Sequence, residues 1–202
     1  MASGIPFDGN PALDELFARH RARLLAIVIR RIDPTLVRRI DPEDVVHESF
    51  LRAREKWEWF DTRGRAVMSE SSWLYKLTRD CLIEMWRKHS GPARDLRREM
   101  AIPDASSMAI FGGLIDSGTR PSQEFAREEL RAQVRQAVEM LKTPDREILW
   151  MKHLDNLSFQ EISEIAQITE NAAYQRHFRA VERFMKLWET IHQPSKESKP
   201  KP

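Results

Sequence analysis

The sequence predicts an all-α protein made of two small helical domains joined by a flexible linker, with a helix-turn-helix in the second domain. Apolar residues recur at helical spacing over most of the chain, and no segment makes a convincing strand. Residues 91–121 hold more than half of the seven glycines and read as a linker. Residues 158–181 read as two short helices joined by a tight turn. We therefore expect domains over 12–90 and 122–192, and a disordered tail over 193–202 that is too polar to pack.

Three helices are expected in the first domain. Residues 12–31 form an amphipathic pattern, and a second helix begins at Asp41, an N-cap, followed by Pro42 at the first helical position. This second helix should run to about Phe60, and Asp41 to Asp61 carries seven acidic residues against three basic ones. After a polar break, a third helix is expected over 73–89.

The helix-turn-helix prediction depends on capping signals and on one apolar face. Ser158 and Glu161 match a capping box that starts the first helix, and Thr169 can cap the second. Gln167 occupies the turn, where a left-handed conformation would cost on the order of 1 kcal/mol. The inward face of the second helix consists of residues at spacings of four, three and four: Ala173, His177, Ala180 and Phe184.

The opposite face of the second helix suits DNA. Asn171 and Gln175 can bond to adenine and Arg179 to guanine in the major groove. The flanking basic side chains suit phosphates: Arg176, Arg183 and Lys186. An ordinary helical hairpin with a solvated polar face is the competing interpretation of this local pattern.

Composition limits the remaining possibilities. The chain has 202 residues, 32% charged and 41% hydrophobic, and a net charge of +2, so DNA contact must come from local basic patches. The single cysteine, Cys81, excludes an internal disulfide and fits a reducing compartment. No apolar run approaches the roughly 20 residues of a membrane span, and we expect a cytoplasmic protein. The histidines and glycines form neither a metal-ligand motif nor a phosphate loop, so no metal, cofactor or catalytic site is expected.

Three segments in order resemble one bacterial family. They are DPEDVVHESFLRA, WLYKLTRDCLIEMWRKH and TPDREILWMKHLDNLSFQEISEIAQITENAAYQRHFRAVERF. Together they resemble an extracytoplasmic-function sigma factor, the small two-domain class of RNA polymerase initiation subunit. The resemblance implies an alternative sigma factor that directs core polymerase to specific promoters, assists promoter melting and has no enzymatic activity of its own. Core RNA polymerase and promoter DNA are the implied partners, and an anti-sigma protein is left open as a further one.

The resemblance also implies three groups of site residues. The acidic second helix would bind core polymerase through Asp44, Val45, His47, Glu48 and Leu51. The third helix and the loop before it would contact the melted minus-ten element through Arg63, Ser72, Trp73, Lys76 and Arg79. The last helix would read the minus-thirty-five element through Asn171, Tyr174, Gln175, Arg176, Arg179 and Arg183.

Several questions stay open at this point. Trp73 either stacks on a base or packs in the core. His47 stands where many members of the family have glutamine, and His177 is expected to be a core histidine satisfied by one hydrogen bond. The linker predicts that the separation of the two domains is not fixed in the free protein. A helix-turn-helix repressor or response regulator that binds operators without polymerase is the alternative function, and an enzyme of unknown type is a weaker one.

Overall fold

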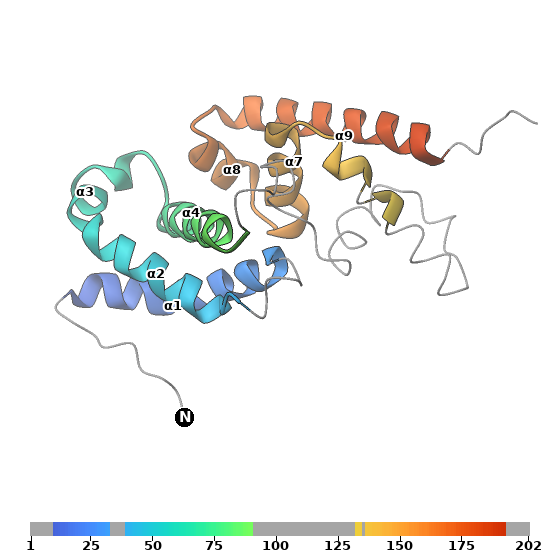
Figure 1. Cartoon of the computed structure of the whole chain (residues 1–202). Helices are drawn as coiled ribbons and strands as arrows, with labels where there is room; N and C mark the ends of the chain where they lie inside the picture. Colours follow the sequence, from blue (N-terminus) through green and yellow to red (C-terminus); the bar gives the residue numbers. More distant parts are fainter. Residues whose placement is uncertain (1–9, 33–38, 91–131, 135, 193–202) are drawn as a thin grey trace, which may run out of the picture.

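The computed structural model describes residues 10–32, 39–90, 132–134 and 136–192 (Figure 1). The predicted linker and tail lie outside these residues. The first half contains α1 (Pro11–Arg31), α2 (Pro42–Glu55), α3 (Trp57–Thr62), the 3-10 turn η1 (Gly64–Ala66) and α4 (Glu70–Ser90). The second half is helical over 132–139 apart from residue 135, which is not described, and then contains α7 (Thr143–Leu149), the π-helical turn η3 (Trp150–Leu154), α8 (Phe159–Ala166) and α9 (Glu170–His192). The described residues contain no strand, and the all-α prediction is confirmed.

Capping residues start the helices of the first half where the sequence indicates, with two differences. Asp41 caps α2 by accepting a hydrogen bond from the Glu43 amide. The expected long helix breaks at Lys56, after which α3 follows. Helix α4 begins at Glu70, earlier than expected, because the Ser69 hydroxyl accepts a hydrogen bond from the Ser72 amide and so provides an N-cap.

The core of the first half lies between α1, α2 and α4. Phe17 of α1 meets Phe50 of α2 edge to face, with ring centroids 5.0 Å apart. Phe60 and Trp73 stack at 4.0 Å between centroids. Cys81 is fully buried in the same cluster, and burial raises the pKa of its thiol to about 12, which keeps it protonated.

The second half contains the predicted helix-turn-helix. The Ser158–Glu161 capping box is complete, and Gln167 ends α8 in the left-handed conformation at φ 54°. Thr169 accepts a hydrogen bond from the Ala172 amide at the start of α9. Ala173, Ala180 and Phe184 are fully buried, so the inward face is confirmed.

The two halves contact each other, and the expectation that their separation is not fixed in the free protein stays a prediction. Helices α4 and α8 lie side by side (Figure 1), and Ile27 and Tyr75 of the first half belong to the apolar cluster of the second. Arg31 of α1 donates to Asp155 at 2.8 Å, and both side chains are buried. Because these partners lie 124 residues apart in the sequence, helical periodicity cannot pair them.

No helix among the described residues is long and apolar enough to cross a lipid bilayer.

Candidate functional site

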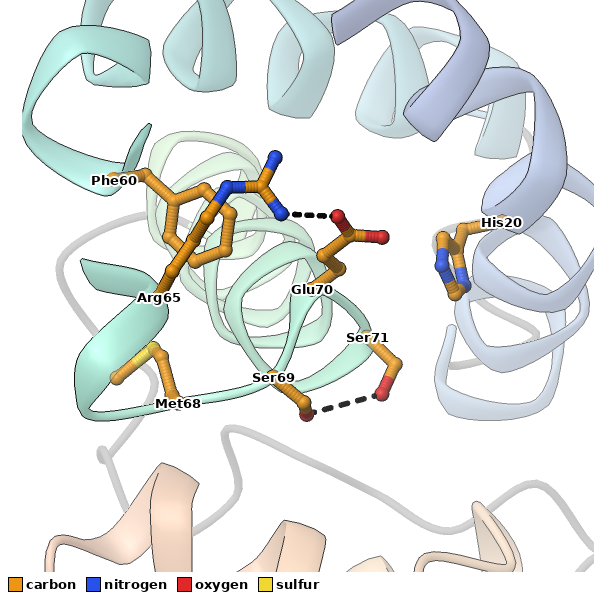
Figure 2. Close-up of a pocket in the computed structure, with 7 residues that line it drawn as sticks. All are labelled: His20, Phe60, Arg65, Met68, Ser69, Glu70 and Ser71. Carbon is orange, nitrogen blue, oxygen red and sulfur yellow. Dashed lines mark hydrogen bonds and ion pairs between the residues drawn. The ribbon is translucent and has the colours of Figure 1, made fainter. Parts of the chain in front are cut away.

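A pocket of about 450 Å³ opens on the first half, beside the loop that leads into α4 (Figure 2). Its lining joins the α3–α4 region with one residue of α1: His20, Phe60, Arg65, Met68, Ser69, Glu70 and Ser71. In Figure 2 His20 faces Glu70 and Ser71 from across the pocket. The lining therefore combines an aromatic wall with hydroxyl, guanidinium and carboxylate groups, which can hold a polar, planar ligand.

Arg65 is the cation of this pocket. It is paired with Glu70 and also donates to Asp61 at 3.0 Å. Its guanidinium lies 5.3 Å from the centroid of the Phe60 ring. Burial and the nearby Arg19 lower the pKa of His20, so this histidine is neutral at pH 7.

The Phe60 ring forms the aromatic wall of the pocket and is held in place by buried neighbours. Trp73 is only 3% exposed and stacks on Phe60, so its ring packs in the core and is not available at the surface for base stacking. A Cβ at Gly64 would lie 2.5 Å from a Phe60 ring carbon, which explains why a residue without a side chain stands there. Trp73 thus supports the pocket through Phe60 and does not line it.

The rim of the pocket is bonded to α8 of the second half. The backbone amide and hydroxyl of Ser69 donate to the Glu164 carboxylate at 2.9 and 2.7 Å. Ser71 donates to Glu161 at 3.1 Å, and Arg23 of α1 donates to the same oxygen at 2.9 Å. Burial opposes ionisation of both glutamates, but these hydrogen bonds outweigh it and lower the pKa of each, so both are charged at pH 7.

The other residues expected to contact the minus-ten element differ in how far their side chains are buried. Arg63 is exposed and Lys76 is half-buried. Ser72 is buried and hydrogen-bonded to Ser69. Arg79 is half-buried and pairs with Asp80 at 3.2 Å and with Glu147 of the second half at 4.0 Å.

Helix α9 presents the polar face that the sequence predicts. Five of the six residues expected to read DNA are exposed on it and form no described hydrogen bond: Asn171, Tyr174, Gln175, Arg176 and Arg179. The buried face of α9 packs in the core of the second half, and this packing fixes the position of the helix that carries them. The sixth, Arg183, is exposed but donates to both carboxylate oxygens of Asp145 at 2.8 Å. One of its nitrogens is therefore already engaged within the protein.

His177 is half-buried and bonded to His153, with the two Nε2 atoms 2.8 Å apart. The expected single hydrogen bond is confirmed. Burial, the neighbouring His153 and Lys152 lower the pKa of His177 to about 4. Among the described residues, no group of three or more histidine, cysteine or acidic side chains is arranged to hold a metal ion.

The acidic helix α2 carries a solvent-facing stripe. Asp44, His47, Glu48 and Leu51 follow helical spacing, and Asp44 and His47 are exposed. Glu48 accepts a hydrogen bond from Arg52 at 3.2 Å. Val45 is fully buried, because its side chain belongs to the apolar face of α2. Val45 therefore does not lie on the surface of the protein, where a polymerase contact was expected.

Sequence reasoning missed the polar residues that join the halves. One signal was present: Leu24, Ile27 and Val28 define an apolar stripe on α1, and Arg31 occupies its next position. A charged side chain on a buried stripe is costly unless it is paired with a buried group of opposite charge. Nothing in the local sequence identifies that partner as Asp155.

Comparisons with known proteins agree with the geometry. The family model described as Sigma-70 region 2 matches residues 16–91. The family model described as Sigma-70, region 4 matches residues 131–184. Among curated proteins, the ECF RNA polymerase sigma factor SigW of Bacillus subtilis is 26% identical over 148 residues, covering 72% of this chain and 74% of that protein. This chain belongs to the extracytoplasmic-function sigma factors of the sigma-70 family.

Two further comparisons cover a larger share of this sigma factor. The ECF RNA polymerase sigma-E factor of Salmonella typhimurium is 28% identical over 177 residues, covering 85% of this chain and 83% of that protein. The solved structure of CnrH in complex with the cytosolic domain of CnrY covers 91% of both chains, with a TM-score of 0.50 and 20% identity. At that identity the similarity concerns the fold alone.

Proposed function

We propose that this alternative sigma factor directs core RNA polymerase to specific promoters and assists their melting, with separate surfaces for the polymerase and for two DNA elements. The observation that carries the proposal is the face of α9. Its polar side chains are exposed while Ala173, Ala180 and Phe184 on the opposite face are buried, so the helix can enter a major groove without losing its packing.

The upstream surface is the α9 face. Asn171, Gln175 and Arg179 have the donors and acceptors that adenine and guanine present in the major groove. Tyr174 and Arg176 flank them. We assign Arg183 to a phosphate, a contact for which it must share its guanidinium with Asp145.

The minus-ten surface is the pocket between His20, Phe60 and the loop that precedes α4. Donors on its rim (Ser69, Ser71) suit the phosphates or base edges of a single strand. Arg63, Lys76 and Arg79 supply positive charge along the same region. The role proposed for Trp73 and Ser72 is support, because both side chains are buried.

The polymerase-binding surface is the stripe on α2. Asp44, His47, Glu48 and Leu51 combine acidic and apolar groups at helical spacing on α2. Charged residues at such a surface mostly guide and orient the partner.

The same proposal includes a cytoplasmic location and no catalytic activity of the chain itself, since this family acts as a DNA-binding subunit of an enzyme. CnrH was solved with the cytosolic domain of CnrY, and we propose that a regulatory protein of anti-sigma type also binds this chain.

Reconstituted transcription tests the function. Adding the protein to bacterial core polymerase and a library of genomic fragments should yield RNAs that begin at a small set of sites with shared upstream sequences. Core polymerase alone should give none of them. If the protein binds those fragments tightly without polymerase and starts no RNA, the repressor interpretation is correct.

A further inference from the structure

Two histidine side chains join η3 to α9. The Nε2 atoms of His153 and His177 lie 2.8 Å apart, while the ring centroids are 5.0 Å apart, so the ring edges that carry Nε2 face each other. His153 belongs to the π-helical turn η3, and turns of this kind occur often at functional sites. Both rings are half-buried, so water reaches part of each. The pair therefore places two imidazole nitrogens next to each other at a position that small ions can reach.

Both rings are in the protonation state that binds metals. Burial and the charge of Lys152 lower the pKa of His153, and burial, His153 and Lys152 lower the pKa of His177 to about 4. Both rings are thus neutral at pH 7, and neutral imidazole is the commonest metal ligand in proteins. In the hydrogen bond, one Nε2 carries the proton. When both Nε2 atoms bind a metal ion, that proton moves to Nδ1 of the same ring, and neither ring changes its charge.

The distance between the two nitrogens is close to the distance that one metal ion requires. Zinc–nitrogen bonds are about 2.0 to 2.1 Å long, and at a tetrahedral angle two such nitrogens lie about 3.3 Å apart. The two Nε2 atoms therefore need to separate by only about 0.5 Å. A small rotation of the side chains provides this shift, because neither ring is fully buried.

The surroundings of the pair select the class of metal. Among the described residues, no third histidine, cysteine or acidic side chain joins the pair, so the remaining ligands must come from water. A site without carboxylates does not suit magnesium or calcium, whereas imidazole suits zinc, nickel and copper. Lys152 is the cation that opposes binding, and its ammonium lies 4.5 Å from the Phe159 ring centroid and donates to the Leu157 carbonyl at 3.2 Å. Two protein ligands and one opposing charge predict weak, reversible binding.

Aromatic contacts connect the pair to the upstream surface. The Phe159 ring meets His177 edge to face with centroids 5.4 Å apart, and it meets Tyr174 edge to face at the same distance. Tyr174 is 51% exposed and belongs to the face of α9 that we assign to upstream DNA. Because packed rings cannot move independently, a shift of His177 is transmitted through Phe159 to Tyr174.

We propose that His153 and His177 bind one transition-metal ion of the zinc type, and that its occupation alters upstream DNA reading through Phe159 and Tyr174. The binding part stands on the geometry of the pair. The regulatory part rests on the proposed function, since it takes α9 as the helix that reads the upstream element.

A titration of the metal-free full chain with Zn²⁺ or Co²⁺ tests the binding part without DNA or polymerase. Calorimetry should show saturation by one ion per chain at concentrations of about 1 to 100 µM. Bound Co²⁺ should show the visible absorption of nitrogen and oxygen ligands without a thiolate band, since Cys81 is buried. A wild-type chain that binds neither ion in this range, or that gives a thiolate band, overturns the proposal.

Glutamine variants separate metal binding from packing. His153→Gln and His177→Gln each keep a polar group that can form a hydrogen bond but remove one imidazole, so Zn²⁺ affinity should fall at least about tenfold. Zn²⁺ should also raise the thermal denaturation midpoint of the wild type and leave both variants unchanged. His192→Gln is the matched control, because His192 lies fifteen residues further along α9, about 22 Å away, and its loss should leave Zn²⁺ binding intact. Equal affinities in the wild type and the two pair variants overturn the proposal.

Promoter selection tests the regulatory part. Holoenzyme that contains the wild-type chain should change its preference at upstream base pairs several-fold when Zn²⁺ is added, whereas holoenzyme with His177→Gln should keep the same preference at every Zn²⁺ concentration. Identical preferences of the wild type with and without bound Zn²⁺ overturn the regulatory part. Failure of the proposed function is distinguishable, since the holoenzyme would then start no RNA under any condition, while calorimetry would still report metal binding.

Discussion

At the residue scale, Trp73 is a buried aromatic side chain that supports the pocket without lining it. Its ring stacks on Phe60, which forms a wall of the pocket, and its tilted contact with Trp57 extends the aromatic cluster. Loss of the Trp73 ring would leave a cavity next to Phe60 and allow that ring to move away from the pocket.

Trp73→Ala should therefore lower the free energy of unfolding by about 3 to 5 kcal/mol, because a large buried aromatic side chain is removed. Chemical denaturation measures the change. Trp59→Ala is the control, since Trp59 is 45% exposed and should cost about 1 kcal/mol or less. Similar losses in both variants would mean that Trp73 is not part of the core.

The His153–His177 pair gives the helix-turn-helix a pH dependence. The folded state lowers the pKa of His177 from 6.5 to about 4, so folding favours the neutral ring. This contribution to stability is complete above pH 6.5 and is lost as the pH falls through about 4.

Denaturation midpoints of the wild-type protein should consequently decrease between pH 6.5 and pH 4. The His153→Leu/His177→Leu double variant should lose less stability over that interval, since its carboxylates titrate as before but the two rings are absent. Parallel pH profiles for the two proteins would contradict a role for the pair.

At the element scale, α9 combines a buried face, which sets its position, with a face that remains free to bind. Gln175→Ala or Arg179→Ala should cost about 1 to 3 kcal/mol in promoter binding by the holoenzyme and relax preference at one or two upstream base pairs. Binding selections on randomised upstream sequences measure both effects.

Arg183→Ala should behave differently from these two variants. A phosphate contact carries no sequence information, so affinity for all sequences should fall and the salt slope should decrease by about one unit. The Asp145 pairing also predicts a small loss of stability. Relaxed sequence preference in Arg183→Ala, equal to that of Gln175→Ala, would refute the division of α9 into two faces.

The α2 stripe makes a separate prediction about the polymerase. Asp44→Ala/Glu48→Ala should weaken core binding, and the loss should grow with salt, because guidance by surface charges is screened. Sedimentation or fluorescence titration with core enzyme measures it. The matched control is Glu182→Ala/Glu189→Ala, which removes two exposed charges from α9. Core binding that is unchanged in the α2 variant would exclude this stripe as the docking surface.

At the scale of the whole molecule, the Arg31–Asp155 pair couples the folding of the two halves. Removing one member leaves a buried charge without a partner, at a cost of about 3 to 5 kcal/mol, unless the halves separate and admit water. Arg31→Ala should therefore turn a single thermal unfolding transition into two, one for each half.

Calorimetry of the full chain distinguishes this coupling from a local effect. Arg52→Ala is the control: its ion pair with Glu84 lies within the first half and is partly exposed, so its loss should lower stability by about 1 kcal/mol or less without splitting the transition. An Arg31→Met/Asp155→Leu variant should recover part of the coupling through apolar contact. A single transition in Arg31→Ala would show that the pair does not join the halves.

The amino-acid sequence by itself determined the local features of this sigma factor. Apolar periodicity predicted the helices. The Ser158–Glu161 capping box and Thr169 predicted where the two helices of the helix-turn-helix begin. The outward residues of α9 followed from the same periodicity, because a helix has one fixed repeat and its two faces can be read from spacing alone.

Tertiary structure decided what depends on contacts between distant residues. The burial of Val45 and Trp73, the pairing of Arg31 with Asp155, and the coverage of Ser69 by Glu164 all required knowing which helix faces which. The reason is physical: periodicity reports that a side chain is turned inward or outward on its own helix, whereas its partner is chosen by the packing of elements far apart in the chain. The contact of α4 with α8 and the buried Arg31–Asp155 pair likewise became visible only in the tertiary structure.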